Sequence, residues 1–221
     1  MGRGVDHAGE RVRLVDGLVR DGYIRSPGVR AAFLRVPRET FLRPEDRGAA
    51  YQDVPLPIGQ GQTISAPSMI AIMLEEAVLE TDMRVLEVGT GSGYHAALLA
   101  ASVGPSNVVS IERHRALAER AQASLAAAGF GGVKVVVGDG SLGFPDRAPY
   151  DCIMATAGAP RIPLSWPPQL ALGGRIVAPV GGSPRSQVLV VVTRRKDGTF
   201  ETREGTPCAF VPLIGKQAWP A

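Results

Sequence analysis

The chain has 221 residues, of which 45% are hydrophobic and 20% are charged, and its formal net charge is +3. This length and apolar content suit one globular domain with a sizeable core, and two domains are not expected. Lysine and arginine are scattered and often stand beside acids, as in Arg38-Glu39, which indicates a solvated surface and argues against nucleic-acid binding. No stretch is apolar enough to span a membrane, and Met1–Asp6 holds no apolar signal-peptide core. We therefore expect a cytoplasmic protein without a membrane or nucleic-acid partner.

Cysteine and histidine usage argues against disulfides and metal sites. Cys152 and Cys208 lie far apart and are flanked by apolar residues, which predicts buried free thiols in a reducing compartment. His7, His95 and His114 are scattered along the chain, so no metal site is expected. We interpret His95 as an exposed helix residue and not as a base.

The N-terminal part of the chain is predicted to be helical. Residues 1–9 are expected to form a flexible tail, and a helix over Glu10–Asp21 follows, because apolar residues recur there at helical spacing. Ser26 followed by Pro27 is typical of an N-cap with proline at the first helical position, so a second helix begins there. A proline-rich connector over 44–57 leads toward the central part of the chain.

The stretch that ends at Pro67 has two interpretations. Ser65 or Ala66 can cap a helix that has Pro67 in its first turn. Alternatively, a small polar loop just before the next strand brings the Ser65 hydroxyl to a reacting group. The spacing of the residues does not decide between a cap and a functional loop.

The most informative stretch is the apolar run Val85–Val88 and the loop that follows it. Such a run predicts a buried parallel strand, and the glycines at positions Gly89, Gly91 and Gly93 let the backbone turn tightly and approach a ligand. The dinucleotide pattern G-x-G-x-x-G requires a further glycine where this chain has Tyr94. The loop therefore indicates a nucleotide-type cofactor other than a dinucleotide.

Glu87, within this strand, points to the class of cofactor. A carboxylate at that position can pair with the ammonium of a cofactor that carries an amino acid, whereas it would repel a pyrophosphate. We therefore predict S-adenosylmethionine (AdoMet) in preference to NAD. A dinucleotide site and a purely structural turn are the alternatives.

Two further acidic positions follow at the ends of predicted strands. A strand over Asn107–Ile111 leads to Glu112, about twenty residues beyond the glycine loop, where a carboxylate can bind both ribose hydroxyls. A strand over Val133–Val137 leads to Asp139 and Gly140, which can hold an adenine amino group, although Asp-Gly is also an ordinary turn sequence. The glycine loop, the acidic residue Glu112 and the Asp139-Gly140 pair each follow a predicted strand at the expected spacing, and together with Glu87 they favour AdoMet.

The rest of the chain alternates helices with strands and then changes to strands alone. Helices are predicted over Tyr94–Ser102 and His114–Ala128 and near Ser165–Leu172, and strands over Asp151–Ala155, Arg175–Val180, Gln187–Thr193, Thr199–Arg203 and Ala209–Leu213. This order predicts an α/β fold, a doubly wound and mostly parallel Rossmann-like sheet with an antiparallel C-terminal hairpin and N-terminal helices. Within the domain, residues 10–80 form a helical and substrate-loop region, 81–180 the cofactor-binding core, and 181–221 the C-terminal strands.

Several segments resemble the protein-L-isoaspartate O-methyltransferases. They are Val36-Pro37-Arg38, Tyr51–Ser65, Leu86–Tyr94, Gly138-Asp139-Gly140, Ala148–Asp151, Ile162-Pro163, Gly173–Arg175 and Phe210–Leu213. The likeness spans the chain in order from the first of these to the last, and its most specific element is the Gly-Gln-Thr-Ile-Ser sequence that ends at Ser65. The chain departs from the usual family pattern at Gln60, Ala66 and Gly158, which bears on substrate preference.

The resemblance implies a reaction and a set of site residues. AdoMet would donate a methyl group to the α-carboxylate of isoaspartyl residues in damaged peptides and proteins, and the ester would be repaired through a succinimide. Ser65 would be the catalytic-site serine. Together with the glycine loop, the cofactor-binding set is Gln62, Thr63, Ile64, Ser65, Glu87, Gly89, Gly91, Gly93, Glu112, Asp139 and Gly140. A carboxylate is already an anion at neutral pH, so Ser65 is expected to position the substrate without acting as a nucleophile.

The partner expected from the resemblance is an isoaspartyl-containing peptide or protein that binds a monomeric enzyme. Substrates of many sequences must be held through their backbone, and we expect an extended peptide against Val211–Leu213 and Gly59–Gln62. The alternatives are a methyltransferase for nucleic acid or a small metabolite, a carboxyl methyltransferase with one dedicated peptide partner, and a non-catalytic AdoMet-binding protein.

Overall fold

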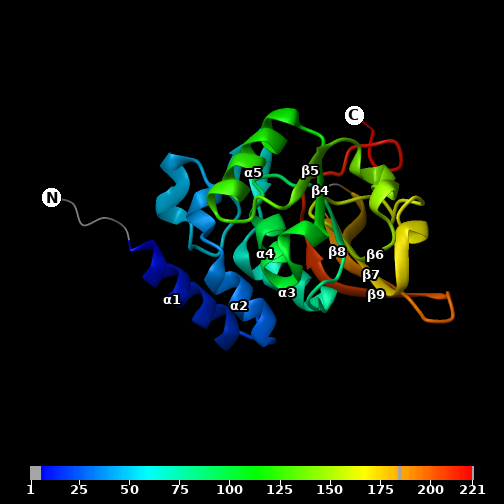
Figure 1. Ribbon diagram of the computed structural model, residues 1–221, viewed down its shortest axis with the longest axis horizontal. Helices are drawn as coiled ribbons and strands as arrows, with labels where there is room; N and C mark the ends of the chain where they lie inside the picture. The colour runs from blue at the N-terminus through cyan, green and yellow to red at the C-terminus, as the bar shows by residue number, and fades with distance from the viewer. Residues whose placement is uncertain (1–5, 184–185, 221) are drawn as a thin grey trace.

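The computed structural model describes residues 6–183 and 186–220, and its N-terminal helices lie at the opposite end of the molecule from the C-terminal hairpin (Figure 1). Helix α1 (His7–Arg20) begins directly after Asp6, whose side chain caps it. The predicted flexible tail is therefore too long, and residues 1–5 lie outside the described part. Helix α2 (Pro27–Arg35) begins at the predicted residue, with Ser26 as its N-cap.

The connector after these helices contains short turns and a hairpin. Two 3₁₀ helices, η1 (Arg38–Phe41) and η2 (Pro44–Ala49), occupy its first part. The polar stretch that follows is an antiparallel hairpin of β1 (Leu56–Gly59) and β2 (Gln62–Ile64). Residues 59–61 at its turn have positive φ, a conformation that glycine adopts without strain, which explains the two glycines there.

The central sheet has seven strands in the spatial order β5-β4-β3-β6-β7-β8-β9. Its strands are β3 (Val85–Val88), β4 (Val108–Glu112), β5 (Lys134–Val137), β6 (Tyr150–Ala155), β7 (Leu170–Ser183), β8 (Ser186–Arg194) and β9 (Phe200–Cys208), and the helices before and between them are α3 (Pro67–Ala77), α4 (Tyr94–Val103) and α5 (Arg115–Ala127). The first five strands in this order, from β5 across to β7, pair in parallel with their neighbours. Strand β8 pairs antiparallel with both β7 and β9. The predicted doubly wound sheet with an antiparallel hairpin is confirmed, and its order reverses beside β3.

The two faces of the sheet are covered by different kinds of structure. Val85 and Met154 belong to the core that α1 to α5 cover, whereas their neighbours Leu86 and Ile153 belong to a second core on the other face. Alternate residues of a strand point to opposite faces, so both sets are buried. On this second face no long helix of the described chain covers the core. Trp166 and the loops that contain short 3₁₀ helices cover it instead.

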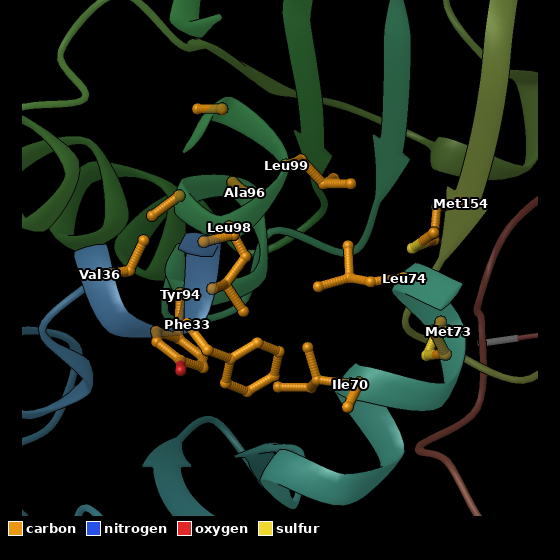
Figure 2. Packing of buried hydrophobic residues seen from close by; sticks show 14 of the residues in the cluster. Phe33, Val36, Ile70, Met73, Leu74, Tyr94, Ala96, Leu98, Leu99 and Met154 are labelled. Carbon is orange, nitrogen blue, oxygen red and sulfur yellow. The ribbon is translucent and has the colours of Figure 1, made fainter. Parts of the chain in front are cut away.

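The helices on the first face pack through interlocking aromatic and aliphatic side chains (Figure 2). Phe33 of α2 and Tyr94 of α4 meet edge to face, with ring centres 6.5 Å apart. Ile70 of α3 lies close to them and is also buried. This packing fixes the N-terminal helices, and the loop before α3, against the helix that follows the glycine loop.

Two elements predicted in the C-terminal half are wrong. The helix near Ser165–Leu172 is reduced to the single turn of η6 (Pro167–Gln169), because two adjacent prolines lack N–H groups and restrict the residues before them. The predicted strand Ala209–Leu213 forms only an isolated bridge, between Pro212 and Gly158. Residues 170–172 instead begin β7, and the rest of the two segments is a short 3₁₀ turn, the isolated bridge and irregular chain.

Both cysteines are free, as predicted, with Cys152 buried and Cys208 half-buried. Burial raises the pKa of Cys152 to about 12 and that of Cys208 to about 11, so both remain thiols at neutral pH. None of the helices in the described part of the chain is long and apolar enough to cross a membrane.

Candidate active site

A cleft lies at the carboxyl ends of the central strands, where the strand order reverses. Open α/β sheets bind their ligands at this place. The predicted site residues that line the cleft are Gln62, Thr63, Ile64, Ser65, Gly89, Gly91, Glu112 and Gly140. The other three, Glu87, Gly93 and Asp139, are not among its lining residues.

The glycines of the site allow close backbone approach, each for its own reason. Gly89 has a φ of +99°, and a Cβ there would lie 2.5 Å from the Oγ1 atom of Thr156, which donates a hydrogen bond to the Gly89 carbonyl. A Cβ on Gly140 would lie 2.4 Å from a methyl group of Val88. Gly93 faces away from the cleft and packs against α5, so its role is to bring the two helices together.

Glu112 is held rigidly at the wall of the cleft. One carboxylate oxygen accepts a hydrogen bond from the backbone N–H of Gly91 and the other from that of His114, each at 2.9 Å. A carboxylate has about four lone-pair sites, so each oxygen can accept a second hydrogen bond from a ligand. The geometry agrees with the predicted contact to ribose hydroxyls.

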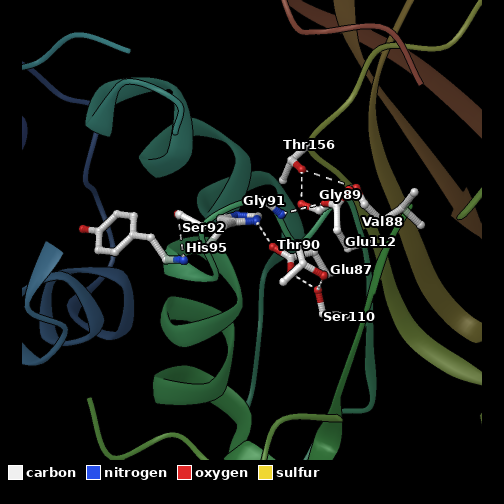
Figure 3. Close-up of polar contacts among 11 residues, drawn as sticks. Glu87, Val88, Gly89, Thr90, Gly91, Ser92, His95, Ser110, Glu112 and Thr156 are labelled. Carbon is white, nitrogen blue, oxygen red and sulfur yellow. Dashed lines mark hydrogen bonds and ion pairs between the residues drawn. The ribbon is translucent and has the colours of Figure 1, made fainter. Parts of the chain in front are cut away.

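Glu87 is fully buried below the cleft, and both of its oxygens bind protein groups (Figure 3). One oxygen lies 3.0 Å from Nδ1 of His95, and the other accepts a hydrogen bond from the hydroxyl of Ser110. Our expectation that Glu87 pairs directly with an ammonium group is therefore not supported, because β3 directs its side chain into the protein. Of the two groups bonded to this carboxylate, the ring of His95 belongs to a residue that lines the cleft.

His95 corrects a second interpretation, since it is not an exposed helix residue. Its side chain is only 7% exposed and the residue lines the cleft, while Nδ1 faces Glu87. Among the described residues no hydrogen-bond partner meets its Nε2 atom, which is buried. The sequence offered one signal, because His95 is the second residue after the glycine loop and the first turn of that helix must face the ligand.

Asp139 turns away from the cleft and caps a 3₁₀ turn. Its carboxylate accepts hydrogen bonds from the N–H and hydroxyl of Ser141, at 2.9 and 2.6 Å, and from the N–H of Lys216 at 2.8 Å. Partial burial raises the pKa of Asp139, but these bonds and the nearby lysine outweigh it, so the pKa lies below its usual value. Asp139 therefore acts as an ordinary turn residue, which was the alternative interpretation of the Asp-Gly sequence. Of the pair, only Gly140 lines the cleft.

Ser65 lines the cleft from the loop between β2 and α3. The N-cap of α3 is Ala66, with no side-chain hydrogen bond to the helix, so the Ser65 hydroxyl is not a helix cap. The backbone of Ser65 is held by Arg38, whose Nη2 atom donates to its carbonyl at 2.9 Å. The loop thus presents the hydroxyl on a fixed backbone.

Arg38 is a residue that sequence reasoning misplaced, since Arg38-Glu39 was expected on a solvated surface. Its side chain is fully buried, and the guanidinium carbon lies 4.9 Å from the ring centre of Tyr94. Burial lowers the pKa of Arg38, while Tyr94 and Asp53 act in the opposite direction. The signal was available, because Arg38 belongs to one of the segments that resemble the methyltransferases.

Val211, Pro212 and Leu213, expected to contact the peptide substrate, also line the cleft. The other lining residues were not predicted as part of the site, and they are Ile70, Met73, Val88, Thr90, Ser92, His95, Ile111, Arg113, His114, Gly138, Thr156, Ala157 and Ile214. Most of them stand next to predicted residues along the chain. Ile70 and Met73 come from the buried face of α3 and give the cleft an apolar wall.

The cleft fits a cofactor that carries both a nucleoside and an amino acid. A rigid carboxylate at Glu112 suits a ribose diol, the Gly140 backbone leaves room for a base, and the unpartnered buried nitrogen of His95 requires a polar group. Fold and site together define the class of AdoMet-dependent methyltransferases.

Comparison with known proteins identifies the family. The model of the protein-L-isoaspartate(D-aspartate) O-methyltransferase family matches residues 10–218, and the chain belongs to this family. It is 53% identical to the protein-L-isoaspartate O-methyltransferase of Hyperthermus butylicus over 218 residues, which cover 95% of this chain and 90% of that one. The predictions of family, fold and AdoMet as the cofactor are confirmed.

Solved structures agree with this assignment. One protein-L-isoaspartate O-methyltransferase superimposes with a TM-score of 0.84 at 34% identity, covering 94% of this chain and 67% of that one. A second structure, from Plasmodium falciparum and described as such an enzyme in complex with S-adenosyl-L-homocysteine, gives a TM-score of 0.82 at 25% identity and covers 95% and 99%.

Proposed function

We propose that this methyltransferase acts at the cleft described above, with Ser65 positioning the α-carboxylate of an L-isoaspartyl residue. The observation that carries the proposal is the state of Ser65, which lines the cleft on a backbone held by buried Arg38 and does not cap α3. Its hydroxyl is thereby left for a ligand. A hydroxyl donor suits a carboxylate, which accepts hydrogen bonds and donates none when ionised.

The reaction places few chemical demands on the side chains. AdoMet supplies a methyl group on a positively charged sulfur, and a carboxylate oxygen forms the new C–O bond while the C–S bond breaks and leaves its electron pair on sulfur. A carboxylate is ionised at neutral pH, so the chain does not have to remove a proton. The contribution of the protein is orientation and exclusion of water, where alignment can supply about 7–11 kcal/mol.

The cofactor roles follow from the walls of the cleft. We assign the ribose hydroxyls to Glu112 and the adenine to the backbone around Gly138 and Gly140. The segment Gln62–Ser65 faces the amino-acid end and the transferred methyl group. Gly89 and Gly91 bring the loop backbone close to the cofactor.

The peptide substrate is proposed to lie beside Val211–Leu213. The N–H of Gly158 donates to the Val211 carbonyl and that of Leu213 donates to the Gly158 carbonyl, both at 2.8 Å, so this segment is held as an extended chain. Gln62 lines the same cleft. Main-chain contacts to such a segment would accept isoaspartyl residues in many sequence contexts.

The finer features of the enzyme rest on the sequence. We propose a monomer that works in the cytoplasm without a nucleic-acid partner, since charges are scattered and both thiols are free. We also propose one domain, whose N-terminal region, cofactor core and C-terminal strands each contribute to the cleft.

Paired synthetic peptides test the proposed function. Two peptides of the same sequence, one with an aspartyl and one with an isoaspartyl linkage, are incubated with the protein and methyl-labelled AdoMet. We expect base-labile methyl ester on the isoaspartyl peptide alone. Equal labelling of both peptides, or label on neither while AdoMet binds, would contradict it.

A further inference from the structure

His95 and Glu87 form a buried pair at the floor of the cleft that the roles assigned so far do not use. Nδ1 of His95 lies 3.0 Å from one oxygen of Glu87, whose other oxygen is bonded to Ser110 (Figure 3). Ser110 in turn lies 2.5 Å, oxygen to oxygen, from the hydroxyl of Thr90. The pair is thus anchored from the sheet side, and the ring cannot turn without breaking it.

The other ring nitrogen is the unusual feature. Nε2 of His95 is buried and meets no hydrogen-bond partner among the described residues, although the residue lines the cleft. A buried polar atom without a partner costs about 1–3 kcal/mol. Such a cost in a preformed site indicates that a ligand atom completes the bond.

Charge balance indicates which ligand atom this is. A buried carboxylate such as Glu87 requires a positive partner, and His95 is the ionisable group bonded to it. Nδ1 faces a carboxylate, which accepts hydrogen bonds, so Nδ1 is a donor; a ring that also carries a hydrogen on Nε2 donates to an anion from that side.

We propose that His95 binds the carboxylate of the methionine part of AdoMet through Nε2–H, with Glu87 as the positioning residue that orients the ring. This inference rests on the proposed AdoMet site. Glu112 and Gly140 take the nucleoside end of the cofactor, so the amino-acid end falls to the remaining polar lining, which includes His95. We had expected Glu87 to pair with the ammonium group of this cofactor, whereas here the buried pair serves its carboxylate.

Calorimetric binding of S-adenosylhomocysteine and two analogues tests the inference, one analogue lacking the carboxylate and the other lacking the amino group. His95→Asn is the informative variant, because its amide can still donate to Glu87 while the Nε2 position is lost. We expect it to weaken binding of S-adenosylhomocysteine and of the deaminated analogue by about tenfold or more, and of the decarboxylated analogue by less than about threefold. Thermal melting verifies folding, and His7→Asn on α1 serves as the matched control with unchanged affinities.

The other outcomes overturn the inference in distinguishable ways. A loss confined to ligands that keep the amino group would mean that Nε2 accepts from the ammonium. An equal loss for all three ligands would give His95 a purely structural role, and no loss would remove it from the site. Failure of the parent protein to bind S-adenosylhomocysteine would overturn the proposed AdoMet site itself.

Discussion

At the scale of single residues, Ser65 separates positioning of the substrate from support of the fold. Because the first turn of α3 is capped by the Asp53 carboxylate, which accepts from the Ser68 N–H, and not by Ser65, Ser65→Ala should leave the melting temperature nearly unchanged, whereas loss of a cap costs about 1 kcal/mol. The same change should lower kcat/KM for an isoaspartyl peptide by about tenfold or more, since misplacement of a reactant can cost about 10²-fold. Steady-state kinetics and thermal melting give both numbers.

Ser65→Thr is the companion variant for that experiment. Threonine keeps the hydroxyl but adds a methyl group to the wall of the cleft, so we expect turnover to fall while the affinity for S-adenosylhomocysteine stays within about threefold of the parent. Parent rates in both variants would remove Ser65 from the active site and leave the cofactor assignment intact.

Glu112 combines binding with local structure, so its substitution should affect both. Glu112→Ala removes the proposed contact to ribose and also the acceptor for the N–H groups of Gly91 and His114. We expect AdoMet affinity to fall by at least about tenfold, because hydrogen bonds to charged groups contribute about 1.5–3 kcal/mol. Titration calorimetry measures the change, and an unaltered dissociation constant would place the ribose elsewhere.

Asp139 is expected to contribute to stability and not to adenine binding. Its pKa is lowered in the folded protein, so its stabilising effect is present above the unfolded value near 4 and is lost as the pH falls through the lower folded value. Asp139→Asn, which loses the bond from Lys216, should therefore lower stability at pH 7 by about 1 kcal/mol, and the difference should shrink at acidic pH. Denaturation followed at several pH values tests this, and a constant difference would contradict it.

At the scale of elements, the glycine loop requires glycine at Gly89 for two reasons, a positive φ and the lack of room for a Cβ atom. Gly89→Ala places a Cβ 2.5 Å from Thr156 Oγ1 at a φ of +99°, so we expect lost AdoMet binding and clear destabilisation. Gly22 has a similar φ of +79° with nothing within 4 Å, and Gly22→Ala should cost only about 1 kcal/mol of strain. Comparison of the two by melting and calorimetry isolates the effect of crowding.

Elements with strong local signals were predictable from the sequence, and elements set by distant contacts were not. Helix α2 begins at Pro27, where the Ser-Pro pattern places it, and the strand before the glycine loop is correct to the residue. The helix near Ser165–Leu172 does not form because adjacent prolines interrupt it, and its buried residues Trp166 and Leu170 join the second core, Leu170 as the first residue of β7. The spacing of apolar residues along the sequence does not show whether a segment will cover the sheet as a helix or as a loop.

At the scale of the whole molecule, the site was predictable by position but not by side-chain direction. The lining residues come from segments between Gln62 and Ile214 that meet only through the strand order. Sequence motifs place Glu87 within a strand and Glu112 and Asp139 at strand ends, yet of these three only Glu112 lines the cleft. Their direction depends on partners such as His95 and Lys216, which are not marked in the motif.

Because the cleft joins segments from both halves of the chain, the cofactor product should stabilise the fold as a unit. A ligand present at about 100 times its dissociation constant stabilises the native state by about 2.7 kcal/mol. For a protein of this size, that corresponds to a rise in melting temperature of roughly 5–11 °C. S-adenosylhomocysteine should produce this rise and slow amide exchange in the Gln62–Ser65 and Val211–Ile214 segments together, while NAD at the same concentration should do neither. Protection confined to the glycine loop would show that the two outer segments do not close on the cofactor.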